Sequence, residues 1–282
     1  MASPAAPQIV DGKYRIEQLL GRGGTGAVYR ARDVPRDRLV ALKIVGAELF
    51  GDPETRRQFQ REAAIIGRLR HPAIVAVYDV GTLADGSAYL VMELVHGEDL
   101  RHLLQREGRL DLQRALPILT TVCAAIEAAH REGILHRDLK PENILLPGGD
   151  VEAKVLDFGV ATVIDALHAP IADAATIATA AGMIVGTPAY MAPEQLRAGP
   201  TDARTDVFSL GVIAFEMLTG DLPFGRSSLA DIVLAHARAV PHMTDVAAPL
   251  ARAIRSALEA EPDRRPASPQ AFAHLISAAA AM

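Results

Sequence analysis

Hydrophobic and polar residues alternate in two different ways along this chain, and the change falls near Gly97. Before it, runs with a period of two predict β-strands at 15–20, 27–32, 39–45, 74–80 and 88–94. One amphipathic helix interrupts them, beginning at Asp52-Pro53 and ending at His71-Pro72. After Gly97 the spacing becomes helical, at 99–106, 111–131, 205–218, 229–238, 247–259 and 268–279. We therefore expect an α+β, bilobal chain: a small five-stranded antiparallel lobe with one main helix, a larger helical lobe, and a cleft between them.

Length and charge narrow the class of protein. The chain has 282 residues, half of them hydrophobic, which suffices for one large bilobal domain or two small ones. Its 29 basic and 34 acidic residues give a net charge of −5, so we expect no nucleic-acid partner. Residues 1–11 are rich in Ala and Pro and are predicted to form a disordered tail.

We expect a cytoplasmic location. Nothing near Met1 resembles a signal peptide, and no segment reaches the roughly eighteen uncharged apolar residues of a membrane helix. A longer parent protein could still be anchored in a membrane beyond residue 282. Cys123 is the only cysteine, which suits a reducing compartment, and we interpret it as a small buried residue of a helix.

Lysine and asparagine are so rare in this chain that their positions indicate candidate functional sites. Among the 29 basic residues only Lys13, Lys43, Lys140 and Lys154 are lysines, and Asn143 is the only asparagine. A residue type that the chain otherwise avoids is more informative where it does occur.

A glycine cluster lies between the first two predicted strands. The sequence Gly21-Arg22-Gly23-Gly24-Thr25-Gly26-Ala27-Val28 has the spacing G-x-G-x-x-G-x-V. A dinucleotide site would need a helix after the glycines, whereas a strand follows here. We therefore expect a β-hairpin whose backbone amides approach phosphate, the alternative being a hairpin without a ligand.

Lys43 lies in the third strand, on the same face as Ala41 and Val45. A charge on an apolar face needs a partner, and Glu62 on the predicted helix is the candidate. Such a pair would hold the lysine against the α- and β-phosphates of a nucleotide. The alternative is a surface lysine whose stem covers apolar neighbours.

The most specific motif is His136-Arg137-Asp138-Leu139-Lys140-Pro141-Glu142-Asn143. Transfer of a phosphoryl group to an alcohol needs a carboxylate to orient the hydroxyl and accept its proton, here Asp138. It needs a cation for the γ-phosphate, here Lys140, and a neutral oxygen ligand for Mg²⁺, here Asn143. Asp157 in Asp157-Phe158-Gly159 follows a strand and is the expected second metal ligand.

With these motifs the sequence resembles the eukaryotic-like protein kinase family, especially its bacterial Ser/Thr branch, over about residues 12–279. The resemblance implies a lobe at 12–95 that binds ATP, a lobe at 96–279 that carries the catalytic loop, and an activation segment at 157–194. It also implies ATP, Mg²⁺ (with Mn²⁺ as an alternative) and protein substrates.

The resemblance assigns further residues to the nucleotide. Met92 occupies the gatekeeper position, and Glu93 to Val95 resemble the hinge that bonds adenine through its backbone. Asp99 lies where an acid that binds ribose is common. The residues expected around the adenine and phosphates are Leu20, Gly21, Gly23, Gly26, Val28, Ala41 and Leu145.

Three structural roles and the acceptor specificity are implied in the same way. Ala192-Pro193-Glu194 resembles the family's A-P-E, with Arg265 as the partner of Glu194, and Asp206 resembles the helix aspartate that anchors the catalytic loop. Lys140 after Asp138, and Thr187 in Gly186-Thr187-Pro188, are typical of Ser/Thr rather than Tyr kinases. Thr187 would hydrogen-bond Asp138 and Lys140.

Regulation by phosphorylation is a further hypothesis. Arg137 precedes Asp138, and in this family such an arginine often receives a phosphate from the activation segment. Residues 166–181 are rich in Ala and Thr, and we expect Thr176 and Thr179 to be autophosphorylated in trans, in a transient homodimer. The alternative is an inert insertion.

Two other classes fit less well. A pseudokinase scaffold usually lacks the lysine, the catalytic aspartate or the metal-binding aspartate, whereas Lys43, Asp138 and Asp157 are all present. A small-molecule kinase normally lacks the Gly-Thr-Pro and Ala-Pro-Glu elements that build a peptide platform.

Overall fold

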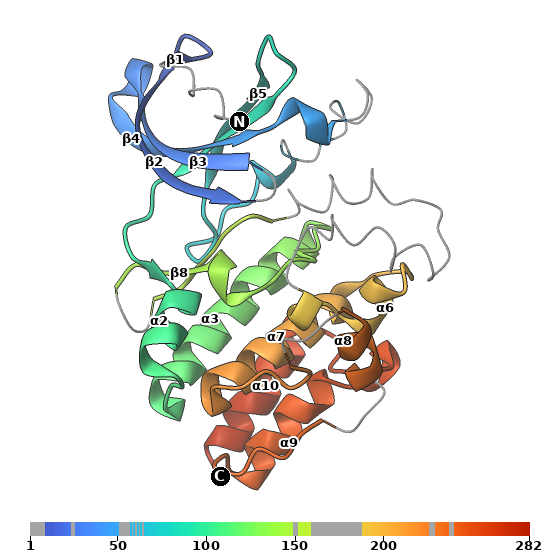
Figure 1. Ribbon diagram of the computed structural model, residues 1–282. Helices are drawn as coiled ribbons and strands as arrows, with labels where there is room; N and C mark the ends of the chain where they lie inside the picture. The colour runs from blue at the N-terminus through green and yellow to red at the C-terminus, as the bar shows by residue number, and fades with distance from the viewer. Residues whose placement is uncertain are drawn as a thin grey trace. The chain divides into compact units, whose positions relative to one another are not determined.

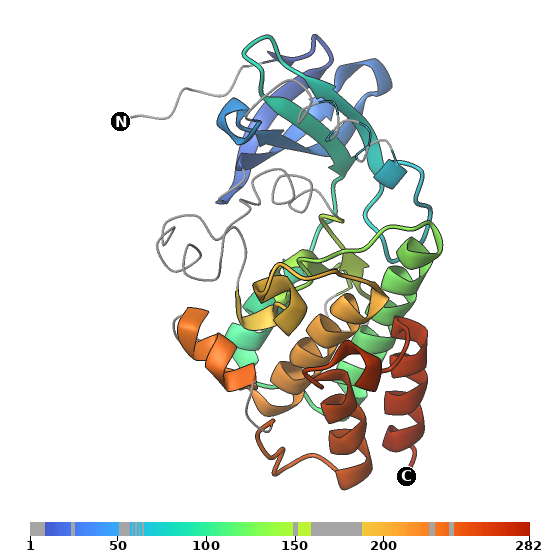
Figure 2. The same ribbon diagram turned by 90° about the vertical axis from the view of Figure 1, so that its right-hand side faces the viewer.

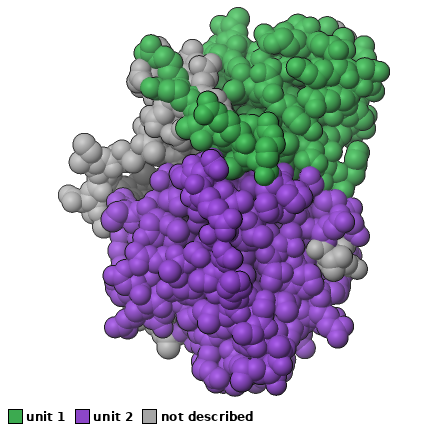
Figure 3. Space-filling view, turned by 180° about the vertical axis from the view of Figure 1, so that it is seen from behind, with its two compact units in different colours: residues 1–70, 75–96, 163–168 green, residues 71–74, 97–162, 169–282 purple. Residues whose placement is uncertain are grey.

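The structure is a computed structural model, and it describes residues 9–23, 26–50, 65–148, 152–158, 188–225, 229–236 and 240–282, with the single residues 57, 59, 61 and 63. The chain divides into two compact units, drawn in different colours in Figure 3. Of the described residues, unit 1 contains those up to Arg70 and Val75–His96, and unit 2 contains His71–Ile74 and those from Gly97 onward. The division of the chain into lobes at 12–95 and 96–279 stays a prediction.

Unit 1 is built on one antiparallel sheet with the strand order β1-β2-β3-β4-β6-β5 (Figure 1). Short 3₁₀ turns follow β3 and β4, at Val34–Arg36 and Ala47–Leu49. Residues 57, 59, 61, 63, 65 and 66 are helical, which agrees with the existence of the expected helix. The helix ends at Ile66 rather than at the predicted His71-Pro72, and its predicted start at Asp52-Pro53 lies outside the described residues. The strands are β1 (Ile9–Val10), β2 (Tyr14–Gly23), β3 (Gly26–Asp33), β4 (Arg38–Val45), β5 (Val77–Thr82) and β6 (Ala88–Glu93).

The sheet has six strands rather than the expected five, because β1 pairs with the start of β2. Asp11 and Gly12 are the central residues of the turn between them, which the Lys13 amide closes by donating to the Val10 carbonyl at 3.0 Å. Their φ angles of 50° and 63° are those of the turns that favour Asp-Gly. Val10 is only 1% exposed, and the Tyr89 hydroxyl donates a 2.8 Å hydrogen bond to Asp11. The tail predicted over 1–11 therefore ends earlier, since Ile9 and Val10 form a strand of the sheet and Asp11 lies in the turn that follows it.

The fourth expected strand begins three residues late. Ile74 forms a parallel bridge to Val155 of unit 2, and the Ala73 carbonyl accepts a 2.9 Å hydrogen bond from the Val155 amide. These backbone groups are therefore already engaged in unit 2, and β5 starts only at Val77.

The two faces of the unit 1 sheet differ in character. One face carries a cluster of buried side chains, against which Ile16, Ile44 and Leu83 pack. Tyr14 and Tyr89 contact each other within it, with ring centroids 5.9 Å apart. The members of this cluster are Val10, Tyr14, Ala31, Val40, Leu42, Tyr89 and Val91.

Unit 2 is mostly helical, with one small sheet in the order β7-β8-β9. The expected helices are confirmed, with ends within one or two residues wherever these ends are described. The elements are β7 (Glu98–Asp99), α2 (Leu100–Glu107), α3 (Leu112–Arg131), β8 (Ile144–Leu146), β9 (Lys154–Val155), α6 (Pro193–Leu196), α7 (Ala203–Thr219), α8 (Leu229–His236), α9 (Ala248–Ala257) and α10 (Pro269–Ala280).

Helix α7 forms the centre of unit 2. Every residue from Thr205 to Leu218 is buried, as expected for a helix that is apolar on nearly all sides. Helices α3, α9 and α10 pack against it, and α10 runs along α3 in both ribbon views (Figures 1 and 2). Cys123 on α3 is fully buried, as expected, and its burial raises the pKa of the thiol to about 12.

Helix α3 is also the one helix in the described part of the chain that is long and apolar enough to cross a membrane. The sequence pattern had suggested no such segment. However, 44% of its apolar window is buried inside unit 2, and Ile118, Ala125 and Ile126 are completely inaccessible. Its apolar residues therefore face α7 and α10, as in the core helix of a folded domain.

Candidate active site

Asp206 of α7 holds the start of the segment 136–143 in place by hydrogen bonds. The Asp206 carboxylate accepts hydrogen bonds from the backbone amides of His136 (2.8 Å) and Arg137 (2.7 Å). A third bond, of 2.7 Å, joins it to the His130 ring on α3. This anchoring role, implied by the resemblance, is confirmed.

Asp206 is inaccessible to solvent, and burial alone would raise its pKa. The hydrogen bond with His130 and the charges of His136 and His130 outweigh this effect, and the pKa of Asp206 lies below its usual 3.8. The anchor is therefore an ionised carboxylate whose acceptor sites point at backbone amides.

Asp138, Lys140 and Asn143 form one hydrogen-bonded group. Lys140 Nζ lies 2.7 Å from Asp138 Oδ2. Asn143 Nδ2 donates to the Asp138 carbonyl at 2.7 Å and lies 3.4 Å from Asp138 Oδ2. Because the amide nitrogen of Asn143 is turned to Asp138, its oxygen is the end that can coordinate a cation. Asn143 is 7% exposed, so its orientation is fixed by its surroundings.

The segment that carries Asp157 is attached to the same loop. His136 Nε2 lies 2.8 Å from the Leu156 carbonyl, and the Leu156 amide donates to the Asn143 carbonyl at 2.9 Å. The rings of His136 and Phe158 are in contact, with centroids 4.9 Å apart. The backbone therefore brings the two expected metal ligands, Asn143 and Asp157, to neighbouring segments.

Two residues of this region have left-handed backbones without being glycine. Arg137 has φ 62° and Asp157 has φ 55°. Such conformations cost about 1 kcal/mol or more and persist where the surroundings impose them, which is common at functional sites. Here the bonds to Asp206 and the contacts of His136 are what impose them.

Unit 1 presents four of the expected nucleotide residues on one face of its sheet. Val28 is paired with Lys43, and Ala41 with Met92, so that each pair lies on the same face. Ala41 and Lys43 are two residues apart in β4 and therefore share that face. Lys43 is only 7% exposed, so it is a buried charge on an otherwise apolar face. This face is opposite to the buried cluster.

The structure explains the glycines of the β2–β3 hairpin in different ways. A Cβ on Gly26 would lie 1.9 Å from the Ile44 carbonyl oxygen, so the fold itself requires glycine there. A Cβ on Gly21 or Gly23 would meet no atom within 4 Å among the described residues. The space beside these two glycines is therefore open to a ligand. Gly24 and Thr25 lie outside the described residues.

The remaining nucleotide residues are distributed over both units. Leu20 is 49% exposed near the end of β2, and Val95 is partly buried just after β6. The Glu93 amide donates to the Ala76 carbonyl at 2.9 Å. In unit 2, Asp99 of β7 pairs directly with Leu145 of β8.

Asp99 has a structural task of its own. Its carboxylate caps α2 by accepting from the His102 amide at 2.9 Å, and its second oxygen lies 2.7 Å from His102 Nδ1. Both oxygens are thus engaged, and the assignment of Asp99 to ribose stays a prediction.

Some of the expected residues lie outside the described part of the chain. Glu62 and Gly159 are among them, as are Thr187 and the threonines of the activation segment, Thr176 and Thr179. The Lys43–Glu62 pair and the bonds of Thr187 therefore remain predictions.

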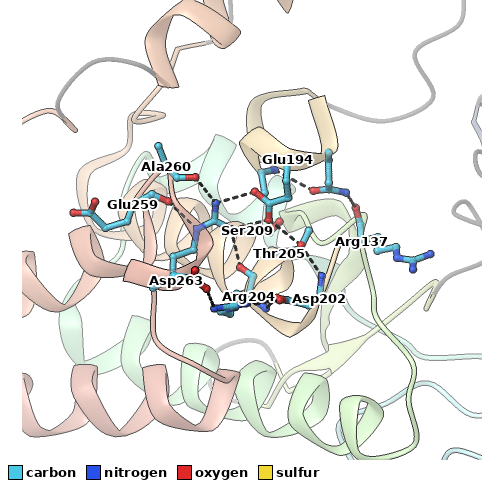
Figure 4. A network of polar contacts seen from close by, with 12 residues as sticks. Arg137, Glu194, Asp202, Arg204, Thr205, Ser209, Glu259, Ala260 and Asp263 are labelled. Atoms are coloured by element: carbon cyan, nitrogen blue, oxygen red, sulfur yellow. Dashed lines mark hydrogen bonds and ion pairs between the residues drawn. The ribbon is translucent and has the colours of Figure 1, made fainter. Parts of the chain in front are cut away.

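The Glu194–Arg265 pair is confirmed as a bidentate ion pair, with both nitrogen–oxygen distances at 2.8 Å. Figure 4 shows Glu194 among its polar neighbours, where Thr205 Oγ1 donates to it at 2.8 Å. Burial opposes ionisation of Glu194, but the hydrogen bond from Arg265 prevails and lowers the pKa of this carboxyl below 4.5. Arg265 also bonds the Glu259 and Ala260 carbonyls, so the pair ties α6 to the segment after α9.

The sequence interpretation missed a second buried ion pair, between Arg101 and Glu216 (2.8 Å). The signal was present, because Arg101 lies among the apolar residues of α2 rather than on its polar side. It also missed His236 of α8, which packs edge-on against Phe208 and Phe224.

No group of three or more His, Cys, Asp or Glu side chains that could hold a metal occurs in the described ranges. The expected metal ligands Asn143 and Asp157 are outside this definition, because they are only two residues and one of them is an asparagine. Both supply oxygen ligands, which are the donors that Mg²⁺ prefers.

Comparison with known proteins indicates the same class of protein as the geometry of the site. The family model described as "Protein kinase domain" matches residues 14–276. The serine/threonine-protein kinase pkn3 of Myxococcus xanthus is 40% identical over 270 residues, covering 92% of this chain and 48% of that protein. PknL of Mycobacterium bovis is 42% identical over 229 residues, covering 80% of this chain and 54% of that protein.

The chain thus spans about half the length of these curated relatives. A solved structure matches it throughout: the kinase domain of Mycobacterium tuberculosis PknI superposes with a TM-score of 0.77 at 28% identity. The superposition covers 99% of this chain and 100% of that domain.

Proposed function

Because this chain belongs to the protein kinase domain family, we propose that it is a serine/threonine protein kinase, transferring the γ-phosphoryl group of ATP to hydroxyls of other proteins. The observation that carries the proposal is the group of Asp138, Lys140 and Asn143, joined by two contacts of 2.7 Å. Its Ser/Thr character is supported by the names of its relatives and by Lys140 two positions after Asp138.

Each residue has a role in this reaction. Asp138 orients the acceptor hydroxyl and takes its proton as the new oxygen–phosphorus bond forms. The bond from the γ-phosphorus to the bridging oxygen breaks, and ADP leaves. Lys140 offsets the negative charge on the transferred group, and Lys43 holds the α- and β-phosphates.

Members of this family use ATP and a divalent metal ion. In this chain Asn143 and Asp157 are the residues that would hold the metal, and Mg²⁺ is the ion we propose, with Mn²⁺ as an alternative. When bound, the metal offsets negative charge on the phosphates. Gly21, Gly23 and Gly26 would bring backbone amides to the phosphates. Leu20, Val28, Ala41, Met92, Glu93, Val95, Asp99 and Leu145 would surround the nucleoside.

The decisive experiment compares wild type with Asp138→Asn, using labelled ATP, Mg²⁺ and a generic protein acceptor. We expect label on Ser and Thr for wild type, and a loss of transfer of at least about a hundredfold for the variant. Asp245→Asn, the same change at an exposed position of unit 2, is the matched control and keeps its activity. Binding of ATP without transfer by wild type would instead indicate a pseudokinase scaffold.

We also propose that Arg137 receives a phosphate from the activation segment. Arg137 Nε is buried and has no hydrogen-bond partner among the described residues. Its carbonyl accepts from Gln195 Nε2 at 2.7 Å, so its backbone is held while the guanidinium lacks a complete set of partners. Phosphates on Thr176 or Thr179 would supply them, placed there by a second copy in a transient homodimer. A cytoplasmic location and the absence of a nucleic-acid partner stay predictions.

A further inference from the structure

A cavity of about 340 Å³ lies in unit 1, among side chains that the proposed function does not use. Three arginines line it: Arg36 just before β4, Arg38 at the first position of β4, and Arg70 beyond the end of the helix. Tyr78 of β5 lines it as well. We call the cavity with these four residues the Arg38 pocket. Its volume lies within the usual range of ligand pockets.

Arg36 and Arg38 are held in place by contacts that leave most of each guanidinium group unused. Arg38 Nε donates to Asp33 Oδ2 at 3.2 Å, and the guanidinium carbon of Arg38 lies 3.7 Å from the centre of the Tyr78 ring. Arg36 Nη1 lies 3.4 Å from the same Asp33 oxygen. Within the described part of the chain, each of these arginines therefore donates a hydrogen bond through only one of its three nitrogens.

Arg70 adds a third guanidinium group that contacts no carboxylate of the described residues. Its Nη1 donates to the carbonyls of Gly67 at 2.7 Å and Leu69 at 2.8 Å, just after the helix ends. These carbonyls fix the side chain but carry no net charge, so the cation is not neutralised. Its Nε and Nη2 are left to donate to a ligand.

The carboxylates near the pocket do not balance the three arginines. Asp33 is 1% exposed, and Arg36 and Arg38 share one of its oxygens. Asp79 lines the cavity, but its two oxygens accept from the Tyr14 hydroxyl at 2.6 Å and from its neighbour's backbone amide at 2.9 Å. Lys13 Nζ also lies 3.9 Å from Asp79. The Arg38 pocket therefore has an excess of positive charge.

We propose that the Arg38 pocket binds the phosphate group of a phosphorylated Ser or Thr side chain of a protein. Guanidinium groups match phosphate oxygens in geometry and charge, and clusters of arginines are a common means of recognising phosphorylated peptides. Tyr78 and Val77 supply apolar surface for the residues beside the phosphorylated one. The inference rests on the proposed function only for the source of the ligand, because a Ser/Thr kinase produces this group.

The pocket is separate from the residues expected to hold the nucleotide. Arg38 precedes Lys43 by five residues of β4, which corresponds to about 17 Å along a strand. A nucleotide held by Lys43 would therefore not fill the Arg38 pocket. A protein that has been phosphorylated once could stay bound there while another of its hydroxyls is modified.

The test is the binding of a fluorescein-labelled peptide library with a fixed central phosphothreonine, compared with the same library carrying Thr. Fluorescence polarisation measures Kd on the Asp138→Asn chain, which we expect not to phosphorylate itself. The phosphorylated library should bind at least about tenfold more tightly, and Arg36→Gln or Arg38→Gln should each weaken this binding about tenfold. Arg15→Gln, at an exposed arginine of unit 1 that does not line the pocket, is the matched control and changes Kd less than about twofold.

Three results would overturn the inference. One is equal affinity for the two libraries, and another is an equal loss in Arg15→Gln, which would indicate attraction to net charge alone. The third is displacement of the library by inorganic phosphate at the same concentration as by unlabelled phosphopeptide, which would indicate a site for free anions. Because the Arg36 side chain is 62% exposed, Arg36→Gln decides the matter if Arg38→Gln does not fold. Binding requires no transfer, so its outcome is independent of the transfer assay that tests the proposed function.

Discussion

Two ion pairs of this domain have similar nitrogen–oxygen distances but differ in solvent exposure. The Arg265–Glu194 pair has nitrogen–oxygen distances of 2.8 Å with side chains 0% and 11% exposed. The Arg109–Asp245 pair is as short, at 2.7 Å, with side chains 55% and 68% exposed. Removing a partner from a buried pair leaves a charge without solvent or counter-ion, whereas a surface charge is simply hydrated.

We therefore predict that Arg265→Ala lowers the free energy of unfolding by about 3–5 kcal/mol. Arg109→Ala, the same substitution in the exposed pair, should change it by less than about 1 kcal/mol. Urea denaturation followed by circular dichroism measures both. Equal losses in the two variants would show that burial does not determine the contribution of these pairs.

His236 predicts a dependence of stability on pH. Burial, with the charges of Arg197 and Arg265, lowers its pKa from 6.5 to about 4. Neither ring nitrogen has a hydrogen-bond partner in the described ranges. The unfolded chain thus binds this proton more readily than the folded one. Neutral His236 therefore contributes to the free energy of unfolding above pH 6.5. As the pH falls toward 4, this free energy decreases by roughly 3 kcal/mol.

His236→Phe should remove this slope, because phenylalanine fits the same aromatic surroundings and does not titrate. His274→Phe on the exposed side of α10 is the control and should retain it. The measurement is the free energy of unfolding at intervals between pH 7 and pH 4.5, above the range in which most carboxylates are protonated. A slope as steep in His236→Phe as in wild type would contradict the assignment, whereas a smaller slope is expected to remain because burial also lowers the pKa of His71.

Among the strands of unit 1, β1 is the one that sequence patterns did not predict. Only two residues pair, and the turn signal Asp11-Gly12 stood within a stretch whose Ala and Pro content suggested a disordered tail. Its stability comes from tertiary contacts, with Val10 in the core and Asp11 bonded to Tyr89. Periodicity cannot reveal a strand that is too short to show a period.

Strand β1 offers a matched pair of substitutions. Val10 is 1% exposed and its neighbour Ile9 is 52% exposed. We expect Val10→Ala to destabilise unit 1 by about 2 kcal/mol and Ile9→Ala to have an effect within about 0.5 kcal/mol. Hydrogen exchange of the β2 amides measures the local loss. Equal protection in both variants would mean that β1 does not contribute to the core.

Elements with dense chemical motifs were predictable, and contacts to which no motif or resemblance pointed were not. The loop at 136–143 was predictable because Lys140 and Asn143 belong to residue types that the chain rarely uses, and the roles of Asp206 and Arg265 followed from the resemblance to the protein kinase family. Arg101 was not identified, because its partners lie 41 and 115 residues away. The sequence says that a buried arginine needs carboxylates, but not which ones.

For the whole molecule, regulation in trans predicts a dependence on concentration. If one copy phosphorylates another, the initial rate of autophosphorylation per molecule rises in proportion to enzyme concentration. Wild type should also label Asp138→Asn added as acceptor, at Thr176 and Thr179. A rate per molecule that is independent of concentration, or active enzyme in which mass spectrometry finds both threonines unmodified, would rule this out.

Helix α7 fixes the positions of three neighbouring segments relative to one another. Three residues of this helix each hold one neighbouring segment: Asp206 holds the catalytic loop, Ser209 the turn at Tyr190, and Glu216 helix α2. They are spaced three and seven residues apart along the helix. Inserting a single residue between Ser209 and Glu216 would rotate the later anchor by about 100° relative to the earlier ones. When chimaeras of such domains are built, the crossover points should therefore lie outside this helix, so that it is inherited whole with all three anchors.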